Sequence, residues 1–234
     1  MTAACDHCLV RNRAICAALS ASELDVLNRI GRRVTVHRGE TLMWEGEDSA
    51  QVANVIEGVL KLSTSTADGR EQIVGMVYPS DFIGRPFGET SRHSVTALSD
   101  ARVCLFSRPA FDAFARAHPG LEHKLLERTL SELDRARDWM LLLGRKSAGE
   151  RVATFLLEMA HRLADTRCAA AGEPAGRFVL PLTRGQMADL LGLTIETVSR
   201  QMTRLKRAGL IDLPDRRMVV ILDPDAMALE AGRG

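Results

Sequence analysis

A stretch of about 25 residues from Pro119 to Gly144 constrains the fold of this chain more than any other feature. Beyond Gly120 it holds no further proline or glycine before Gly144, which stands where the C-terminal cap of a helix is expected. The stretch therefore predicts one helix about 37 Å long. Six of its residues recur at intervals of three and four positions, the heptad pattern by which a helix pairs with a copy of itself. This predicted dimer seam consists of Leu126, Thr129, Leu133, Ala136, Met140 and Leu143.

Other apolar residues of the same stretch lie off the seam. Leu121, Leu125 and Leu142 are expected to pack within their own subunit. A helix buried entirely within one subunit is the alternative. The length of the stretch and its two sets of apolar positions favour a homodimer.

The residues before this helix have the pattern of a small all-β unit. Short apolar runs alternate there with glycine, proline and aspartate, which indicates an antiparallel barrel or roll. A serine followed three residues later by a glutamate, Ser20 and Glu23, predicts a short helix before the roll. The expected strands are Val34 to Val36, Val52 to Ile56, Val59 to Leu62, Ile73 to Val77 and Val103 to Phe106.

The residues after the long helix predict a winged helix-turn-helix. Two capping boxes open helices, and a glycine turn at Gly192 precedes a further helix capped by Thr194. Two apolar runs separated by Pro214 and Asp215 predict a β-hairpin wing. The capping boxes are Ser147 with Glu150 and Thr183 with Gln186, and the wing runs are 210–213 and 218–221.

The second helix of this motif carries a polar face suited to reading DNA. Its first two turns hold an acid, a hydroxyl and an arginine on one side, with an apolar stripe on another. Arginine bonds the O6 and N7 atoms of guanine, glutamate accepts from the cytosine amine, and serine serves several bases. A merely solvated face is the alternative. The expected DNA-binding residues are Glu196, Ser199, Arg200, Thr183, Arg184, Thr194, Thr197, Thr203 and Arg204.

The net charge of +1 hides an asymmetry that supports this prediction. Residues 1–100 hold 10 basic and 13 acidic side chains, whereas residues 177–217 hold 8 basic and 4 acidic ones. A basic segment attracts phosphate backbones whatever the base sequence. The charge is therefore concentrated where the DNA reader is expected.

The order of roll, long helix and winged helix-turn-helix resembles the CRP/FNR family of bacterial transcription regulators. The strings LTRGQMADLLGLT (182–194) and ETVSR (196–200) carry the resemblance, together with the segments Arg38 to Glu40 and Glu45 to Glu47 of the roll. Glu196, Ser199 and Arg200 at this spacing are similar to the FNR branch. The resemblance implies binding of double-stranded DNA at an inverted repeat of TTGAT type. It also implies contact with RNA polymerase through the loop around Arg85 to Arg92.

The expected fold is therefore α+β, with a cyclic-nucleotide-binding-like roll. The predicted divisions are a cysteine-rich segment (1–19), a β-roll sensor domain (20–117), a dimerisation helix (118–144) and a winged helix-turn-helix DNA-binding domain (145–234). No apolar run reaches the roughly 18 residues of a membrane span, and no secretory signal precedes the first cysteines. We therefore expect a cytoplasmic protein without membrane contact.

Three of the five cysteines crowd into the first sixteen residues, and in a reducing compartment such clusters more often bind metal or do redox chemistry than form disulfides. Cys5, Cys8 and Cys16 supply three thiolates, and Cys104 is the expected fourth. Four thiolates suit a [4Fe–4S] cluster. The resemblance to the FNR branch implies the same ligand set, although seven residues rather than five separate the second and third cysteines here. Cys168 matches nothing and is expected to be a bystander.

Other roles for the cysteines remain open at this stage. Four thiolates also bind zinc, for which His7 could replace Cys104. The thiols could instead form a metal-free redox switch, or Cys104 could be an ordinary core residue.

A regulator of the same fold that senses another small effector, such as a cyclic nucleotide or a haem-borne gas, is the alternative function. In cyclic-nucleotide sensors of the family a glutamate follows the glycine of the Asp81-to-Gly84 turn, but Arg85 stands there in this chain. The sequence contains no nucleotide-binding glycine loop and no hydrolase or zinc-protease motif, so no enzyme is expected.

Overall fold

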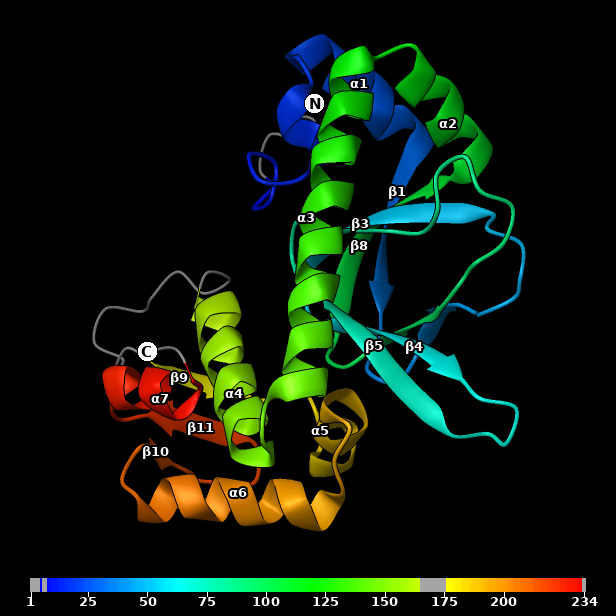
Figure 1. The fold of residues 1–234 in the computed structure, drawn as a ribbon. Coiled ribbons are helices and arrows are strands. Elements are labelled where there is room, and N and C mark those ends of the chain that lie inside the picture. The colour runs from blue at the N-terminus through cyan, green and yellow to red at the C-terminus, as the bar shows by residue number, and fades with distance from the viewer. Residues whose placement is uncertain (1–4, 6–7, 165–175, 233–234) are drawn as a thin grey trace. The chain divides into compact units, whose positions relative to one another are not determined.

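The computed structural model describes residues 5, 8–164 and 176–232, and the chain forms two compact units, residues 1–135 and 136–234 (Figure 1). The division falls inside the long helix α3 (Pro119–Arg145), which confirms the predicted long helix and spans 27 residues where about 25 were expected. Among the described residues, no helix is both long enough and apolar enough to cross a membrane.

The first unit contains a β-roll of two four-stranded antiparallel sheets. Its strands are β1 (Gly31–Val36), β2 (Thr41–Met43), β3 (Gln51–Glu57), β4 (Leu60–Ser65), β5 (Glu71–Val77), β6 (Phe82–Ile83), β7 (Ser94–Ala97) and β8 (Ala101–Ser107). One sheet has the order β1-β8-β3-β6 and the other β2-β7-β4-β5. Aliphatic side chains from both sheets, including Val55, Leu60 and Val103, fill the space between them. The five predicted strands are confirmed, whereas β2, β6 and β7 were not predicted.

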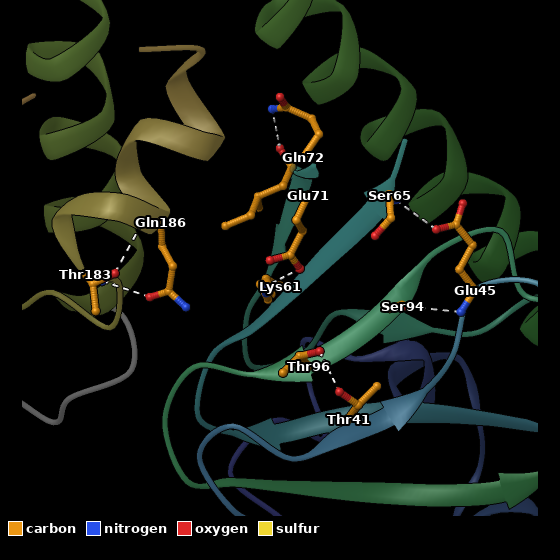
Figure 2. A network of polar contacts seen from close by, with 11 residues as sticks. Thr41, Glu45, Lys61, Ser65, Glu71, Gln72, Ser94, Thr96, Thr183 and Gln186 are labelled. Carbon is orange, nitrogen blue, oxygen red and sulfur yellow. Dashed lines mark hydrogen bonds and ion pairs between the residues drawn. The ribbon is translucent and has the colours of Figure 1, made fainter. Parts of the chain in front are cut away.

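Polar contacts join the strands of the second sheet (Figure 2). The Lys61 ammonium on β4 pairs with the Glu71 carboxylate on β5. The backbone N–H of Glu45 donates to Ser94 Oγ over 3.0 Å, and the carboxylate of Glu45 accepts from the backbone N–H of Ser65 over 3.1 Å. Glu45 therefore ties the segment after β2 to both β4 and β7.

Helices cover the outer face of the sheet that contains β8 (Figure 1). They are the 3-10 turn η1 (Ile15–Ala18), α1 (Ala21–Ile30), α2 (Arg108–Arg116) and the first turn of α3. Phe106 of β8, Phe111 of α2 and Leu121 of α3 are buried together in this layer, as expected for Leu121. The predicted capping box of α1 is present, with Ser20 and Glu23 each accepting a backbone N–H.

The end of α3 differs from the prediction at Gly144. This residue lies in the last turn of the helix, which continues to Arg145, so the expected glycine cap is wrong. The guanidinium of Arg151 instead donates to the carbonyl oxygens of Leu143 (2.7 Å) and Lys146 (2.9 Å). These bonds satisfy carbonyl groups at the helix end, to which backbone N–H groups at a left-handed glycine cap would otherwise donate.

The second unit is a winged helix-turn-helix. It contains α4 (Ala148–Ala164), β9 (Arg177–Val179), α5 (Arg184–Leu191), α6 (Ile195–Arg207), β10 (Ile211–Asp212), β11 (Met218–Ile221) and α7 (Pro224–Glu230). The capping boxes at Ser147 and Thr183 are confirmed. Gly192 ends α5 with a φ of 61°, a conformation that suits glycine. The predicted wing is present, but β9 adds a third strand to it, and neither β9 nor α7 was predicted. The α+β fold class is confirmed.

Candidate functional site

Cys104 lies on the outer face of its sheet, beneath the N-terminal segment. Its neighbours on β8, Val103 and Leu105, point into the core of the roll, so Cys104 points the opposite way. There it packs against the apolar layer that contains Ile15 and against a smaller cluster of Val10, Ala14 and Ile56. Cys16 packs on the first of these clusters and Cys8 on the second. The fold thus brings Cys104 to the segment that holds the other predicted ligands.

The thiols of this patch influence one another electrostatically. Burial, with smaller contributions from the nearby Cys104, Cys5 and Cys8, raises the pKa of the Cys16 thiol to about 12. Burial also raises the pKa of Cys104 to about 12, with Cys5 and Cys8 adding to the effect and Arg33 opposing it. Ionisation of one thiol therefore opposes ionisation of the next, as expected for groups in close proximity. We call Cys5, Cys8, Cys16 and Cys104 the thiol patch.

The side chains of the thiol patch are not arranged around a common centre. Cys5 Sγ is directed at Asn28 Oδ1 of α1, 3.6 Å away. Within the part of the chain that the structure describes, no three histidine, cysteine or acidic side chains are arranged to hold a metal ion. The chemistry of the donor set nevertheless fits a four-thiolate group, because four half-buried sulfurs share one patch and none forms a disulfide there. His7 and Cys168 lie outside the described residues.

The polar face of α6 is exposed as the sequence predicted. Glu196, Ser199, Arg200 and Thr203 are exposed, while Val198, Met202 and Leu205 are buried in the second unit. A groove on this face is lined by Ser199, Arg200, Thr203, Arg204 and Arg207. Among the described residues, Arg200 has no hydrogen-bond or ion-pair partner, so its guanidinium is available to a ligand.

Other predicted DNA-binding residues already make contacts within the chain. Arg204 pairs with the Glu230 carboxylate of α7, and its Nε donates to Gln201 Oε1 over 2.9 Å. The hydroxyls of Thr183 and Thr194 cap α5 and α6, respectively, and Thr194 Oγ1 also donates to the Thr197 hydroxyl. Arg184 is partly buried, and this burial lowers the pKa of its guanidinium. These contacts stabilise the two helices of the motif in the absence of DNA.

The predicted seam of α3 presents large apolar side chains to solvent. Leu126 is 55% exposed, Leu133 44% and Met140 73%. Thr129 and Ala136 are also exposed and Leu143 is half-buried. Leu130 and Leu141, which the heptad pattern did not include, are more than half exposed and widen the stripe. An apolar stripe of this extent marks an interaction surface.

The loop expected to contact RNA polymerase surrounds an exposed aromatic residue. Phe87 has a φ of 58°, unusual for a residue with a side chain, and its backbone N–H donates to both carboxylate oxygens of Asp112 at 3.2 and 3.3 Å. The Arg116 guanidinium lies 5.6 Å from its ring centre. Contacts with α2 therefore hold this loop in its conformation.

Comparison with known proteins identifies the family. Residues 33–118 match the cyclic nucleotide-binding domain, and residues 150–229 match the Crp-like helix-turn-helix domain. The chain is 44% identical over 228 residues to the transcriptional activator protein FnrL of Cereibacter sphaeroides, an alignment that covers 97% of this chain and 92% of the relative. The chain belongs to the CRP/FNR family. A second relative in this family, the nitrogen fixation regulation protein FixK of Bradyrhizobium diazoefficiens, is 42% identical over 207 residues, covering 88% of this chain and 85% of the relative.

A solved structure agrees with this assignment. FixK2 from Bradyrhizobium japonicum superposes with a TM-score of 0.77 at 34% identity, over 86% of this chain and 96% of that one. As a CRP/FNR member, this protein is a DNA-binding transcription regulator and not an enzyme. Regulators of this family bind DNA as dimers.

Sequence reasoning missed several residues that surround the candidate sites. Asn28 faces Cys5, and Arg33 and Asn54 flank Cys104 on neighbouring strands. The one available signal was Asn54 itself, a lone polar residue in the apolar run from Val52 to Ile56. Glu230, the partner of Arg204, gave no sequence signal because α7 was not predicted.

Proposed function

We propose that this CRP/FNR regulator senses oxygen through a [4Fe–4S] cluster held by Cys5, Cys8, Cys16 and Cys104. As a dimer it binds an inverted repeat of TTGAT type and controls anaerobic gene expression. The observation that carries the proposal is the thiol patch, in which sulfurs from the N-terminal segment meet Cys104 of the roll. When bound, the cluster would supply an oxygen-sensitive redox group that links these parts of the chain.

The fold provides a route from the thiol patch to the dimer seam. Cys16 and Cys104 pack against the same apolar layer as Leu121 and Leu125 of α3. Fixing the two cysteines to one group restrains that layer and so the helix that carries the seam. A difference of a few kcal/mol between the two states is enough to change occupancy of the dimer.

Each part of the chain then has one role. Residues 1–19 and 20–117 sense, 118–144 dimerise through the seam of Leu126, Thr129, Leu133, Ala136, Met140 and Leu143, and 145–234 bind DNA. A dimer places two copies of α6 about 34 Å apart, one turn of DNA, so that each half-site assists the other. The loop from Arg85 to Arg92 is proposed to contact RNA polymerase.

Purification without oxygen tests the proposed function. The protein is expected to be brown, to contain about four irons per chain, and to lose both colour and operator binding in air. Colourless protein that contains zinc would contradict iron–sulfur sensing. Operator binding that needs a cyclic nucleotide instead of iron would favour the alternative effector. Arg85 argues against that alternative, because a cation stands where a ribose hydroxyl needs an acceptor.

A charge placed in the seam is expected to dissociate the dimer. Leu133→Arg removes one exposed leucine from each helix of the pair and buries two like charges. Because Leu133 is 44% exposed, the apolar loss alone is about 0.7 to 1.3 kcal/mol per leucine, which raises the dimer dissociation constant about tenfold or more for two copies. Analytical ultracentrifugation of the cluster-loaded protein measures this change.

Ser131→Arg is the matched control, since Ser131 is exposed on α3 but lies off the seam. It should leave the dimer intact. An unchanged dimer in Leu133→Arg would place the interface elsewhere. Sedimentation of wild-type protein with and without cluster gives the second comparison, for which the proposal requires a shift from monomer to dimer on loading.

A further inference from the structure

Cys104 lies in the middle of a row of three paired residues that runs across the sheet of β1, β8 and β3. Arg33 of β1 is its partner on one side and Asn54 of β3 its partner on the other, both in antiparallel register. Residues directly opposite each other in such a pair have their Cβ atoms about 4.5 to 5.5 Å apart and point to the same face of the sheet. Asn54 is therefore the side-chain neighbour of Cys104 on the β3 side of the sheet.

Asn54 is buried beneath the N-terminal segment. Its neighbours along β3, Ala53 and Val55, point into the roll, whereas Val52 and Ile56 point to the two apolar clusters that hold the thiol patch. Asn54 lies between these two contacts and is 2% exposed. The N-terminal segment and the sheet thus enclose its amide.

The amide oxygen of Asn54 has no hydrogen-bond partner, although it is fully buried. A buried polar group without a partner costs about 1 to 3 kcal/mol, and an aliphatic residue in this strand would avoid that cost. An amide in such a place therefore points to a ligand that is not part of the polypeptide. The iron–sulfur group that the thiol patch is proposed to hold would lie beside the amide of Asn54.

We propose that Asn54 is a positioning residue for the iron–sulfur group, with its amide nitrogen donating a hydrogen bond to the sulfur of Cys104 or to an adjacent sulfide. The inference rests on the proposed function. A half-turn of the amide exchanges its oxygen for its nitrogen at little steric cost. Thiolates and sulfides are acceptors only, so the nitrogen is the end of the amide that stabilises them.

Such a bond has measurable consequences. Hydrogen bonds to the sulfurs of a cluster help to set its reduction potential, and residues that orient metal ligands change metal affinity about 10- to 100-fold when they are replaced. The positive charge of Arg33 on the other side of Cys104 acts in the same direction, because it favours the thiolate. The Cys104 ligand is thereby stabilised from both neighbouring strands.

The test is anaerobic loading of the full chain with ferrous iron and sulfide, in wild type, Asn54→Leu and Asn54→Asp. Asn54→Leu keeps the number and branching of the side-chain heavy atoms and removes the amide, and Asn54→Asp keeps the shape and removes the donor. Both are expected to lose the cluster in air about tenfold faster than wild type. In resonance Raman spectra, the iron–sulfur bands of wild type should shift in D2O, and that shift should be smaller in both variants.

The cluster-free proteins separate this role from a structural one. Asn54→Leu should unfold at the same temperature as wild type or higher, because it removes a buried unpartnered oxygen. Ser49→Ala is the matched control, since Ser49 is also buried with an unpartnered hydroxyl oxygen but precedes β3. It should leave the lifetime of the cluster unchanged.

The outcomes distinguish the two proposals. Wild-type protein that binds no iron–sulfur cluster overturns the proposed function and this inference with it. Wild-type protein that binds the cluster, with the same lifetime and the same D2O shift in Asn54→Leu and Asn54→Asp, overturns the role of Asn54 alone.

Discussion

Replacing Cys104 by serine is expected to reduce the iron retained after anaerobic purification from about four atoms per chain to nearly none. Cys104 is the one member of the thiol patch on the β-roll, and the other three belong to the segment before α1. Without it, three thiols on one short segment remain, and the described residues of the apolar layer beneath them include no further cysteine or methionine. Iron and sulfide analysis of the purified protein measures the effect.

Cys168→Ser is the control, because Cys168 matches no ligand of the proposed set and lies outside the described residues. It should retain iron, colour and operator binding. The same pair of variants tests the alternatives. Zinc retained by Cys104→Ser would indicate a site completed by another residue, such as His7. Iron retained at the wild-type level would remove Cys104 from the ligand set.

The high pKa values in the thiol patch add a pH dependence to this comparison. The pKa values of Cys16 and Cys104 rise to about 12 in the folded, cluster-free protein, so both thiols are protonated near neutrality. Ligation requires thiolates, and loading therefore releases protons and improves as pH rises. Because the raised pKa values mean that the folded state binds these protons more tightly than the unfolded state, the stability of cluster-free protein falls above pH 9.

Local signals in the sequence predicted the parts of the fold that depend on neighbouring residues. The capping boxes at Ser20, Ser147 and Thr183 each satisfy backbone groups within three residues, so the pattern alone located the start of the helix. The long helix followed from the lack of glycine and proline. The cap predicted at Gly144 was wrong because a residue of another helix takes its place. The guanidinium of Arg151, on α4, donates to a carbonyl oxygen that the cap would have satisfied.

Elements that depend on distant partners were not predictable in this way. β7 is held between β2 and β4, which contribute residues more than thirty positions earlier in the chain. β6 has two residues and exists through pairing with β3. The pattern of each strand is too short to distinguish it from a loop, because β7 alternates over only four residues and β6 has two.

The residues of the candidate sites also fall into those that local spacing predicts and those that depend on distant parts of the chain. The polar face of α6 was predictable because helical spacing alone places Glu196, Ser199 and Arg200 together. Cys104 was assigned by resemblance to a family, since nothing local links it to Cys16. Asn54 is a lone polar residue in an apolar run, but its link to Cys104, fifty residues away, follows only from the strand register. Strand pairing therefore carries information about the site that spacing along the chain does not.

Arg200→Ala is expected to weaken operator binding by about 1 to 3 kcal/mol at each half-site, which is about 30-fold or more for a dimer that uses two. Arg200 lies exposed in the groove of α6, and its guanidinium has no partner among the described residues. No contact within the protein must therefore be broken before it bonds a guanine. Titration of labelled operator by fluorescence anisotropy at fixed salt measures the change.

Arg204→Ala is the matched comparison on the same groove. Its guanidinium is held by Glu230 and Gln201 in the free protein, so contact with DNA requires that this pairing be rearranged and the loss should be smaller. Operators with the recognised guanine replaced distinguish base contact from phosphate contact. If Arg200 reads a base, Arg200→Ala should bind operator and mutated operator almost equally. An equal loss on both sequences, with a shallower salt dependence, would instead assign Arg200 to the phosphate backbone.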